Sequence, residues 1–150
     1  MDAPAILPIY LLVKYILYSS WCYRGVKRLR PSQEKRVASA MMYGLTRLPF
    51  GFGFGILIYL GGSLVMGAVF DLPLSGVITY LIVYVPVRWI EWSIIGAMIS
   101  SSGGFVRDLI RPSSLEQLRW RAGGIVVSFI ADIPMIIVFD GMLPVGRFMC

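Results

Sequence analysis

Residues 77–100 read VITYLIVYVPVRWIEWSIIGAMIS, an apolar stretch with only two charged side chains, Arg88 and Glu91. A helix needs about 20 predominantly apolar residues to cross the hydrocarbon core of a bilayer. The stretch is long enough for one complete crossing. It therefore predicts a transmembrane helix, and the rest of the chain can be compared with it.

The composition of the whole chain agrees with that prediction. Of 150 residues, 57% are hydrophobic and 15% are charged, whereas a soluble domain is roughly 45–50% apolar and 25% charged. A soluble chain of this size has too little interior to hide so much apolar surface. We therefore expect an all-α, polytopic integral membrane protein in which residues 1–150 form a single transmembrane domain. It would be a four-transmembrane-helix bundle with spans at roughly 5–23, 48–70, 77–100 and 123–140.

The distribution of Lys and Arg predicts how this bundle lies in the membrane. Six of these residues follow the first span and four follow the third, whereas the opposite side has only Arg147. Because cytoplasmic loops carry the excess of Lys and Arg, we expect both the N- and C-termini on the non-cytoplasmic side. Two spans or six spans are the alternatives. Six spans would each be too short to cross a bilayer of about 30 Å. This topology explains the net charge of +6, so no nucleic-acid partner is expected.

Short interfacial helices are predicted in the two basic loops. The first begins at Pro31-Ser32 and continues into the second span, with a bend at Pro49. In the other loop, the spacing of Ser113 and Glu116 matches a capping box, which predicts the start of the helix that leads into the fourth span. An amphipathic helix before it has an apolar face formed by Phe105, Val106, Leu109 and Ile110.

The chain contains no histidine and two cysteines, Cys22 and Cys150. Without histidine there is no His-ligated haem or zinc site and no Ser-His-Asp triad within the chain. The two cysteines have no metal-binding spacing, and the predicted topology places them on opposite sides of the membrane. We expect no cofactor and no metal, and we favour a protein that is not an enzyme.

Glycines form a stripe along the second span. Gly44, Gly51, Gly55 and Gly62 are 7, 4 and 7 residues apart, so they share one helical face. Small residues let helix backbones approach closely inside a membrane. The stripe therefore predicts a helix-packing surface, either within the bundle or with a second chain in a homo- or hetero-oligomer.

Each span also has one polar face. The polar face of the third span consists of Tyr80, Tyr84, Arg88 and Glu91. Lys14 lies on the polar face of the first span, and Asp132 lies on that of the fourth. In the second span, Arg47 shares the face that carries the glycines. Charged groups at the membrane centre cost about 2.5–3.5 kcal/mol each, so they face the interior of a bundle. We therefore expect a buried cluster formed by Lys14, Arg47, Tyr80, Tyr84, Arg88, Glu91 and Asp132.

Two interpretations of this cluster remain open. Arg88 with Glu91, and Lys14 with Asp132, can form buried ion pairs that fix the helix register without any ligand. Alternatively, the excess positive charge and the tyrosines bind an anionic lipid or an organic anion. In that case the protein is a small transporter or binding protein, or a subunit of a larger membrane complex.

Two alternative functions complete the set. The bundle is either a purely structural scaffold subunit, or a membrane-embedded enzyme of the glutathione- or lipid-conjugating type that holds an anionic cosubstrate. The span number, the basic first loop and the frame formed by Arg36-Val37, Ala40 and Pro49 are similar to the membrane-associated eicosanoid and glutathione metabolism family. That resemblance implies a conjugating activity, but Tyr43 and Thr46 occupy the places where the family pattern has Asn and Glu.

Overall fold

The computed structural model describes the backbone of residues 3–69, 76–100 and 105–138, and the side chains of 8–56, 84–100 and 105–134. These segments form five helices, and the expected all-α fold is confirmed for them. The helices are α1 (Ala3–Leu29), α2 (Arg36–Val69), α3 (Gly76–Ser100), α4 (Phe105–Ile110) and α5 (Leu115–Val138).

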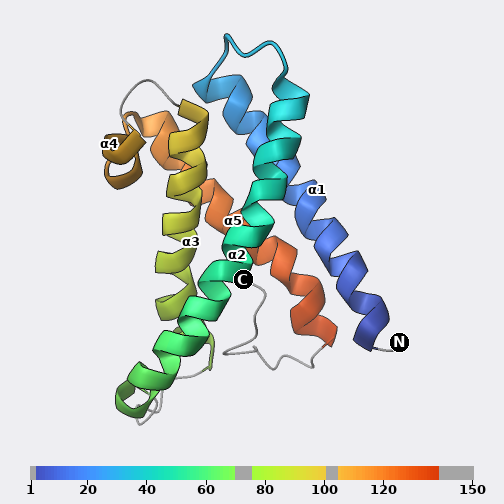
Figure 1. The fold of residues 1–150 in the computed structure, drawn as a ribbon, viewed down its shortest axis with the longest axis vertical. Helices are drawn as coiled ribbons and strands as arrows, with labels where there is room; N and C mark the ends of the chain where they lie inside the picture. Colours follow the sequence, from blue (N-terminus) through green and yellow to red (C-terminus); the bar gives the residue numbers. More distant parts are fainter. Residues whose placement is uncertain (1–2, 70–75, 101–104, 139–150) are drawn as a thin grey trace.

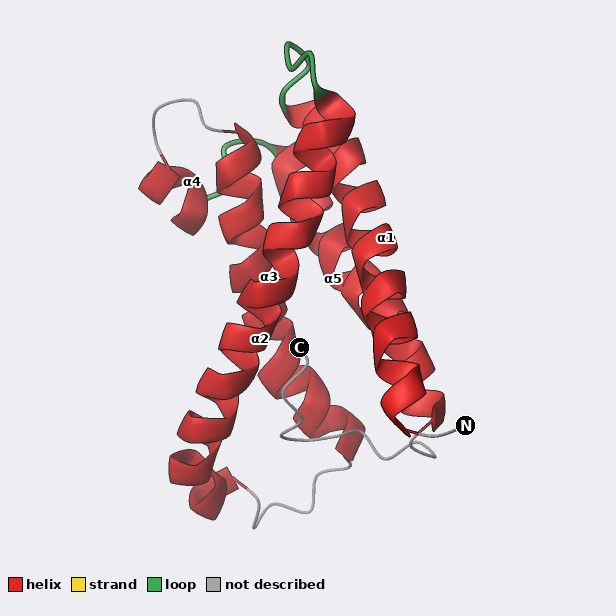
Figure 2. Cartoon of the chain, turned by 45° about the vertical axis from the view of Figure 1, so that its right-hand side comes forward, coloured by secondary structure: helices red, strands yellow, loops and turns green. Residues whose placement is uncertain are grey.

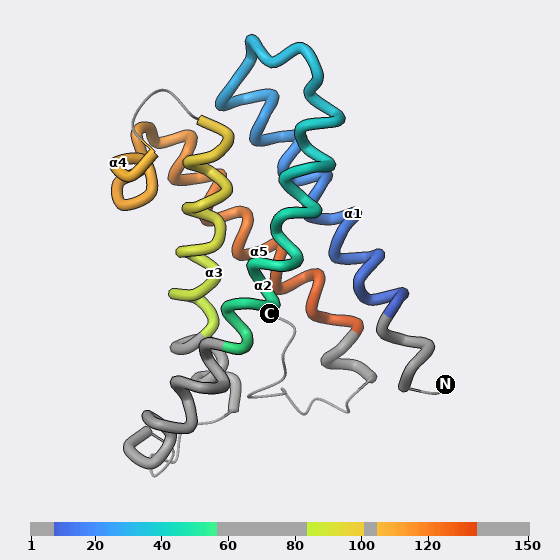
Figure 3. The backbone as a smooth tube through the Cα atoms, in the orientation of Figure 1, coloured from blue at the N-terminus to red at the C-terminus, as the bar shows by residue number. Residues whose placement is uncertain are grey.

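The four long helices pack into one bundle, and α4 is a short helix beside it. Figures 1 and 2 show the α1–α2 loop, α4 and the beginning of α5 at the same end of the molecule. We call this the basic end, because both predicted basic loops lie there. The tube in Figure 3 shows α2 returning alongside α1, and α5 also packs against α1. Within the described residues, no helix combines the length and apolar character that crossing a membrane requires.

The α1–α2 connection differs from the sequence prediction. Residues 30–35 form a loop, and α2 begins at Arg36 rather than at Pro31-Ser32. Arg36 holds this loop, because its guanidinium donates hydrogen bonds to the backbone oxygens of Gln33 at 3.1 Å and Pro31 at 2.6 Å. The helix then continues through Pro49 as a single element.

The N-terminal cap of α5 lies one residue later than predicted. The hydroxyl oxygen of Ser114 accepts a hydrogen bond from the backbone N–H of Gln117 at 3.1 Å. Gln117 Oε1 accepts in turn from the backbone N–H of Ser113 at 2.6 Å. The cap is therefore Ser114 with Gln117, not Ser113 with Glu116. Both pairs have the three-residue spacing of a capping box, so spacing alone did not distinguish them.

The predicted amphipathic segment forms α4, and its orientation is now defined. Phe105, Val106 and Ile110 are 47%, 67% and 78% exposed, while Asp108 on the opposite side is buried. The carboxylate of Asp108 accepts a hydrogen bond from the Ser100 hydroxyl at 2.9 Å. α4 is therefore attached to the bundle through its polar side and presents its apolar side outward.

Two tryptophans join α1 to α5 through a reciprocal contact. Trp21 Nε1 donates to the carbonyl oxygen of Trp120 at 3.1 Å, and Trp120 Nε1 donates to that of Trp21 at 3.2 Å. Each indole also covers a glycine on the opposite helix. A Cβ added to Gly25 would lie 2.6 Å from the Trp120 ring, and one added to Gly123 would lie 2.3 Å from the Trp21 ring. Only glycine permits this separation of the two helices.

The centre of the bundle is aromatic. The ring of Trp92 meets the rings of Tyr18 and Trp120 edge to face, with centroids 5.7 and 5.4 Å apart. Trp92 Nε1 donates to the Ser128 hydroxyl at 3.0 Å, so its polar atom is satisfied. A Cβ added to Gly124 would lie 2.4 Å from the Trp92 ring, which explains why α5 has glycine at that position.

Part of the predicted glycine stripe packs inside the single chain. A Cβ added to Gly44 would lie 2.8 Å from the backbone nitrogen of Ser19, so α1 and α2 are nearly in backbone contact there. Gly51 and Gly55 are buried as well. Gly62 falls outside the residues whose surroundings are described.

Candidate functional site

Five buried charged side chains form one continuous network. Asp132 binds Lys14 and Arg88, with each nitrogen to oxygen distance equal to 2.9 Å. Arg88 also approaches Glu91 at 3.4 Å, and Glu91 binds Arg47. We call Lys14, Arg47, Arg88, Glu91 and Asp132 the charge network. Its order, Lys14 to Asp132 to Arg88 to Glu91 to Arg47, connects α1, α5, α3 and α2.

The helices present these groups through simple periodicity. Lys14 follows Tyr10 by one turn on α1, and the Tyr10 hydroxyl donates to Asp132 at 2.8 Å. The ammonium group of Lys14 lies 4.5 Å from the centre of the Tyr10 ring. On α3, Arg88 and Glu91 are three residues apart and so share a face. Because Arg88 contacts both carboxylates, it is the bridge at the centre of the network.

Arg47 occupies the most enclosed position. Its side chain is 0% exposed, and its guanidinium lies 5.1 Å from the Tyr18 ring centre and 5.4 Å from that of Trp92. Aromatic faces attract a cation, which favours burial of this guanidinium. However, among the described residues its Nε and Nη1 atoms find no hydrogen-bond partner, and neither does Oε1 of Glu91.

The charge of the network does not balance. Three cations, Lys14, Arg47 and Arg88, face two carboxylates. Removing charges from water costs several kcal/mol for each ion, and complete pairing is needed to offset that cost. The charge network therefore carries one positive charge more than its carboxylates can neutralise.

The remaining predicted site residues are placed as follows. Tyr84 lies one turn before Arg88 on α3 and is buried at 5% exposure. Tyr80 falls outside the residues whose side chains are described. The structure thus brings the five predicted charged residues into contact with one another, with Tyr84 on the same helix face.

A fourth buried cation, Arg121, was not predicted as a site residue, because its sequence position assigned it to the basic loop. Arg121 is 0% exposed, donates to the Ser93 hydroxyl at 2.9 Å and to the Leu109 carbonyl oxygen at 3.3 Å, and also contacts the Asp108 carbonyl oxygen. Burial lowers the pKa of its guanidinium, while the Asp108 carboxylate acts in the opposite direction. Arg121 therefore fastens α4 to α3 and α5.

The same contact region includes Gln117 on α5. Its side-chain N–H donates to the Ser100 hydroxyl at 3.4 Å, and this residue is fully buried. The four-residue spacing of Gln117 and Arg121, which puts both on one face of a helix, was the available sequence signal. This spacing was overlooked because Arg121 was counted only as one of the cytoplasmic loop cations, and that count does not distinguish buried cations from exposed ones.

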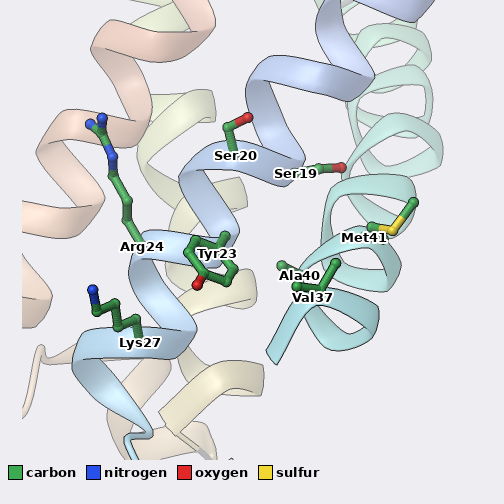
Figure 4. A pocket seen from close by; sticks show the side chains of 8 residues that line it. All are labelled: Ser19, Ser20, Tyr23, Arg24, Lys27, Val37, Ala40 and Met41. Atoms are coloured by element: carbon green, nitrogen blue, oxygen red, sulfur yellow. The ribbon is translucent and has the colours of Figure 1, made fainter. Parts of the chain in front are cut away.

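Two hollows flank the end of α1 that carries Arg24 and Lys27. One, of about 610 Å³, lies between α1 and α2. Figure 4 shows Arg24 and Lys27 at one edge of it, with Val37, Ala40 and Met41 of α2 on the other side. The second, of about 390 Å³, lies between α1 and α5 and also includes Arg24 and Lys27. Both hollows are at the basic end and are separate from the charge network.

Comparisons with known proteins give no relative: no family model, curated protein or solved structure matches the chain. In the described part of the chain, no three Cys, Asp or Glu side chains converge as ligands. Function is therefore inferred from the contacts, burial and charge of the residues described above.

Proposed function

We propose that this chain is an integral membrane protein that crosses the bilayer four times, with both termini on the non-cytoplasmic side, and that it binds an anionic ligand at its charge network. The membrane assignment is supported by the inverted arrangement of its side chains. Large apolar residues point outward, such as Leu12, Phe52 and Ile130 at 57%, 53% and 49% exposure, while the charge network is inside. Lipid favours apolar side chains on the outside and forces charges into the bundle.

The observation that carries ligand binding is the excess cation of the network. Within the part of the chain that the structure describes, Arg47 contacts one carboxylate, Glu91, and has two side-chain nitrogens, Nε and Nη1, without hydrogen-bond partners. A carboxylate or phosphate oxygen at Arg47 would neutralise the excess charge and accept these hydrogen bonds, which are strongest when both groups are charged. The ligand class is therefore an organic anion or the head group of an anionic lipid.

The test compares Arg47→Met with the exposed control Arg111→Met. Without Arg47, two cations remain with two carboxylates, so the variant is expected to fold. Thermal unfolding in a neutral detergent is followed by circular dichroism, with succinate, sulfate or phosphatidylglycerol added. We expect at least one of these anions to raise the Tm of the wild type and of Arg111→Met by more than it raises that of Arg47→Met.

Two results would reject this function. Either no anion protects the wild type, or every anion that protects it protects Arg47→Met equally well. The two sources of anion are separated in the same experiment, because succinate and sulfate are soluble and phosphatidylglycerol enters only with the detergent micelle.

A structural scaffold is the second candidate, and the continuous pairing from Lys14 to Arg47 favours it. In a scaffold the network fixes the positions of the helices and needs no ligand. Assembly with another chain through the glycine face stays a prediction; the contact of Gly44 with α1 favours a role within the chain for that part of the face.

A further inference from the structure

An open groove lined by cations lies between α1 and α5 at the basic end. We call it the basic groove. Its volume is about 390 Å³, and its lining consists of Trp21, Arg24, Lys27, Arg28, Arg119 and Trp120. It shares no residue with the charge network, so the two positive regions can be altered independently.

The helical repeat explains why these groups converge. Trp21, Arg24 and Arg28 follow one another at steps of three and four, which places them on one face of α1. Arg119 and Trp120 come from the first turns of α5. The reciprocal Trp21 and Trp120 hydrogen bonds hold the two helices together at this level. The tryptophans therefore fix the distance between the cations of α1 and the cation of α5.

The four cations of the groove lack acidic partners. No carboxylate is present among its lining residues, and none of the four forms an ion pair with any residue that the structure describes. The Arg24 guanidinium lies 5.6 Å from the centre of the Trp21 ring, which orients it beside the groove. A concave site lined by one sign of charge concentrates ions of the opposite sign. The groove is therefore suited to an anion with several oxygen atoms.

We propose that the basic groove binds the phosphate of an anionic phospholipid from the cytoplasmic leaflet. Tryptophan is enriched at the level of lipid head groups, and basic pockets between helices on the cytoplasmic side bind such head groups. The exposed apolar side of α4, formed by Phe105, Val106 and Ile110, lies at the same end of the molecule (Figure 1). This end therefore combines phosphate-binding cations with apolar groups suited to the membrane interface. The inference rests on the membrane assignment of the proposed function but not on its charge network.

The experiment compares two variants of the full-length chain with equal loss of charge. One is Lys27→Gln/Arg28→Gln/Arg119→Gln in the groove. The other is the matched control Arg30→Gln/Lys35→Gln/Arg111→Gln, which alters cations of the same end outside the groove. Native mass spectrometry in a neutral detergent measures binding of phosphatidylglycerol, phosphatidylcholine and inorganic phosphate, and Tm is measured on the same samples.

We expect the wild type to retain phosphatidylglycerol in preference to phosphatidylcholine and to be stabilised by it. Each cation near an anionic lipid surface contributes roughly fivefold in affinity, so the groove variant should bind phosphatidylglycerol about 100-fold more weakly. The control variant should bind it within about twofold of the wild type, since its altered residues do not line the groove. Five of these six positions are exposed and the sixth, Arg30, is half-buried, so we expect unaltered helix content in both variants.

Three results would overturn the inference. The groove variant and the control could lose affinity equally, which would indicate only the general attraction of a positive surface. Inorganic phosphate could bind as tightly as phosphatidylglycerol, which would identify a soluble ligand. The wild type could also fail to prefer phosphatidylglycerol. Should the groove variant not fold, Arg119→Glu compared with Arg111→Glu applies the same criteria. Arg47→Met should keep its phosphatidylglycerol binding, so failure of the network proposal is recognised separately.

Discussion

The charge network and the basic groove are both rich in positive charge, but their surroundings differ completely. In the network, Lys14, Arg47 and Arg88 are no more than 2% exposed and are held by carboxylates. In the groove, Arg28 and Arg119 are exposed, and no carboxylate is among the described residues that line it. A buried cation must be paired for the chain to fold, whereas an exposed cation stays hydrated and remains available to a ligand. The difference teaches that burial, rather than charge, decides whether a cation must be paired for the chain to fold or can stay hydrated until a ligand binds.

The largest effect on stability should come from Glu91→Gln. This change removes one of two carboxylates and leaves three buried cations with Asp132 alone. Breaking a buried ion pair typically costs about 3–5 kcal/mol because the remaining charge is uncompensated. Chemical unfolding followed by circular dichroism should show a loss of that size. If Glu91→Gln unfolds like the wild type, the network does not stabilise the bundle and the contrast with the groove disappears.

Arg88→Met sharpens the same comparison. Although Arg88 is the central bridge, its removal leaves Lys14 with Asp132 and Arg47 with Glu91, two balanced pairs. We therefore expect a smaller loss of stability than for Glu91→Gln, measured by the same unfolding experiment. The opposite order would mean that bridging outweighs charge balance. The double variant Glu91→Gln/Arg47→Met should recover part of the Glu91→Gln loss, because it also removes the cation left unpaired.

An intermediate effect is expected for Gly44→Ala, which acts on the packing that encloses Arg47. The added Cβ would lie 2.3 Å from the Ser19 hydroxyl oxygen and 2.8 Å from the Ser19 backbone nitrogen, so α1 and α2 must separate. Overpacking of this kind costs about 1–3 kcal/mol. Gly53→Ala is the matched control, since a Cβ there meets nothing within 4 Å. Equal melting temperatures for the two variants would show that close approach at Gly44 is unimportant.

A loss of about 1 kcal/mol is expected for Trp120→Phe, which removes one of the two hydrogen bonds between α1 and α5. Because Trp21 and Trp120 both line the basic groove, phosphatidylglycerol binding should weaken together with stability. Thermal unfolding and native mass spectrometry measure the two effects. If stability falls while lipid binding is unchanged, the tryptophans do not position the cations of the groove.

The smallest effect on folding should follow Arg119→Gln. Arg119 is exposed and has no ion-pair partner among the described residues, so its replacement should change the free energy of unfolding by no more than about 0.5 kcal/mol. Affinity for phosphatidylglycerol should nevertheless fall. Such a variant, stable but weaker in binding, is the opposite of Glu91→Gln. A large loss of stability would show that Arg119, like Arg121, holds the fold together rather than binding a ligand.

Much of the fold was predictable because helices and their faces are local properties of the chain. The four long helices contain the four predicted apolar stretches apart from residues 70 and 139–140, which lie outside the described residues, and Phe105 to Ile110 form the expected short helix. The predicted start of α2 was five residues too early and the predicted cap of α5 was one residue too early, because helix ends depend on hydrogen bonds such as those of Arg36 and Ser114. Membrane insertion, topology and ligand remain proposals.

The sequence by itself determined which residues form helices, which face of each helix is polar and which end of the bundle is basic, since all three follow from composition and a 3.6-residue period. Only the tertiary structure decided that Arg47 binds Glu91, that Arg121 is buried and that Trp21 and Trp120 bond reciprocally. The physical reason is the distance along the sequence between the residues that interact. A helical repeat relates residues a few positions apart, whereas a partner on another helix depends on how closely glycines let the backbones approach and on how deeply each side chain is buried.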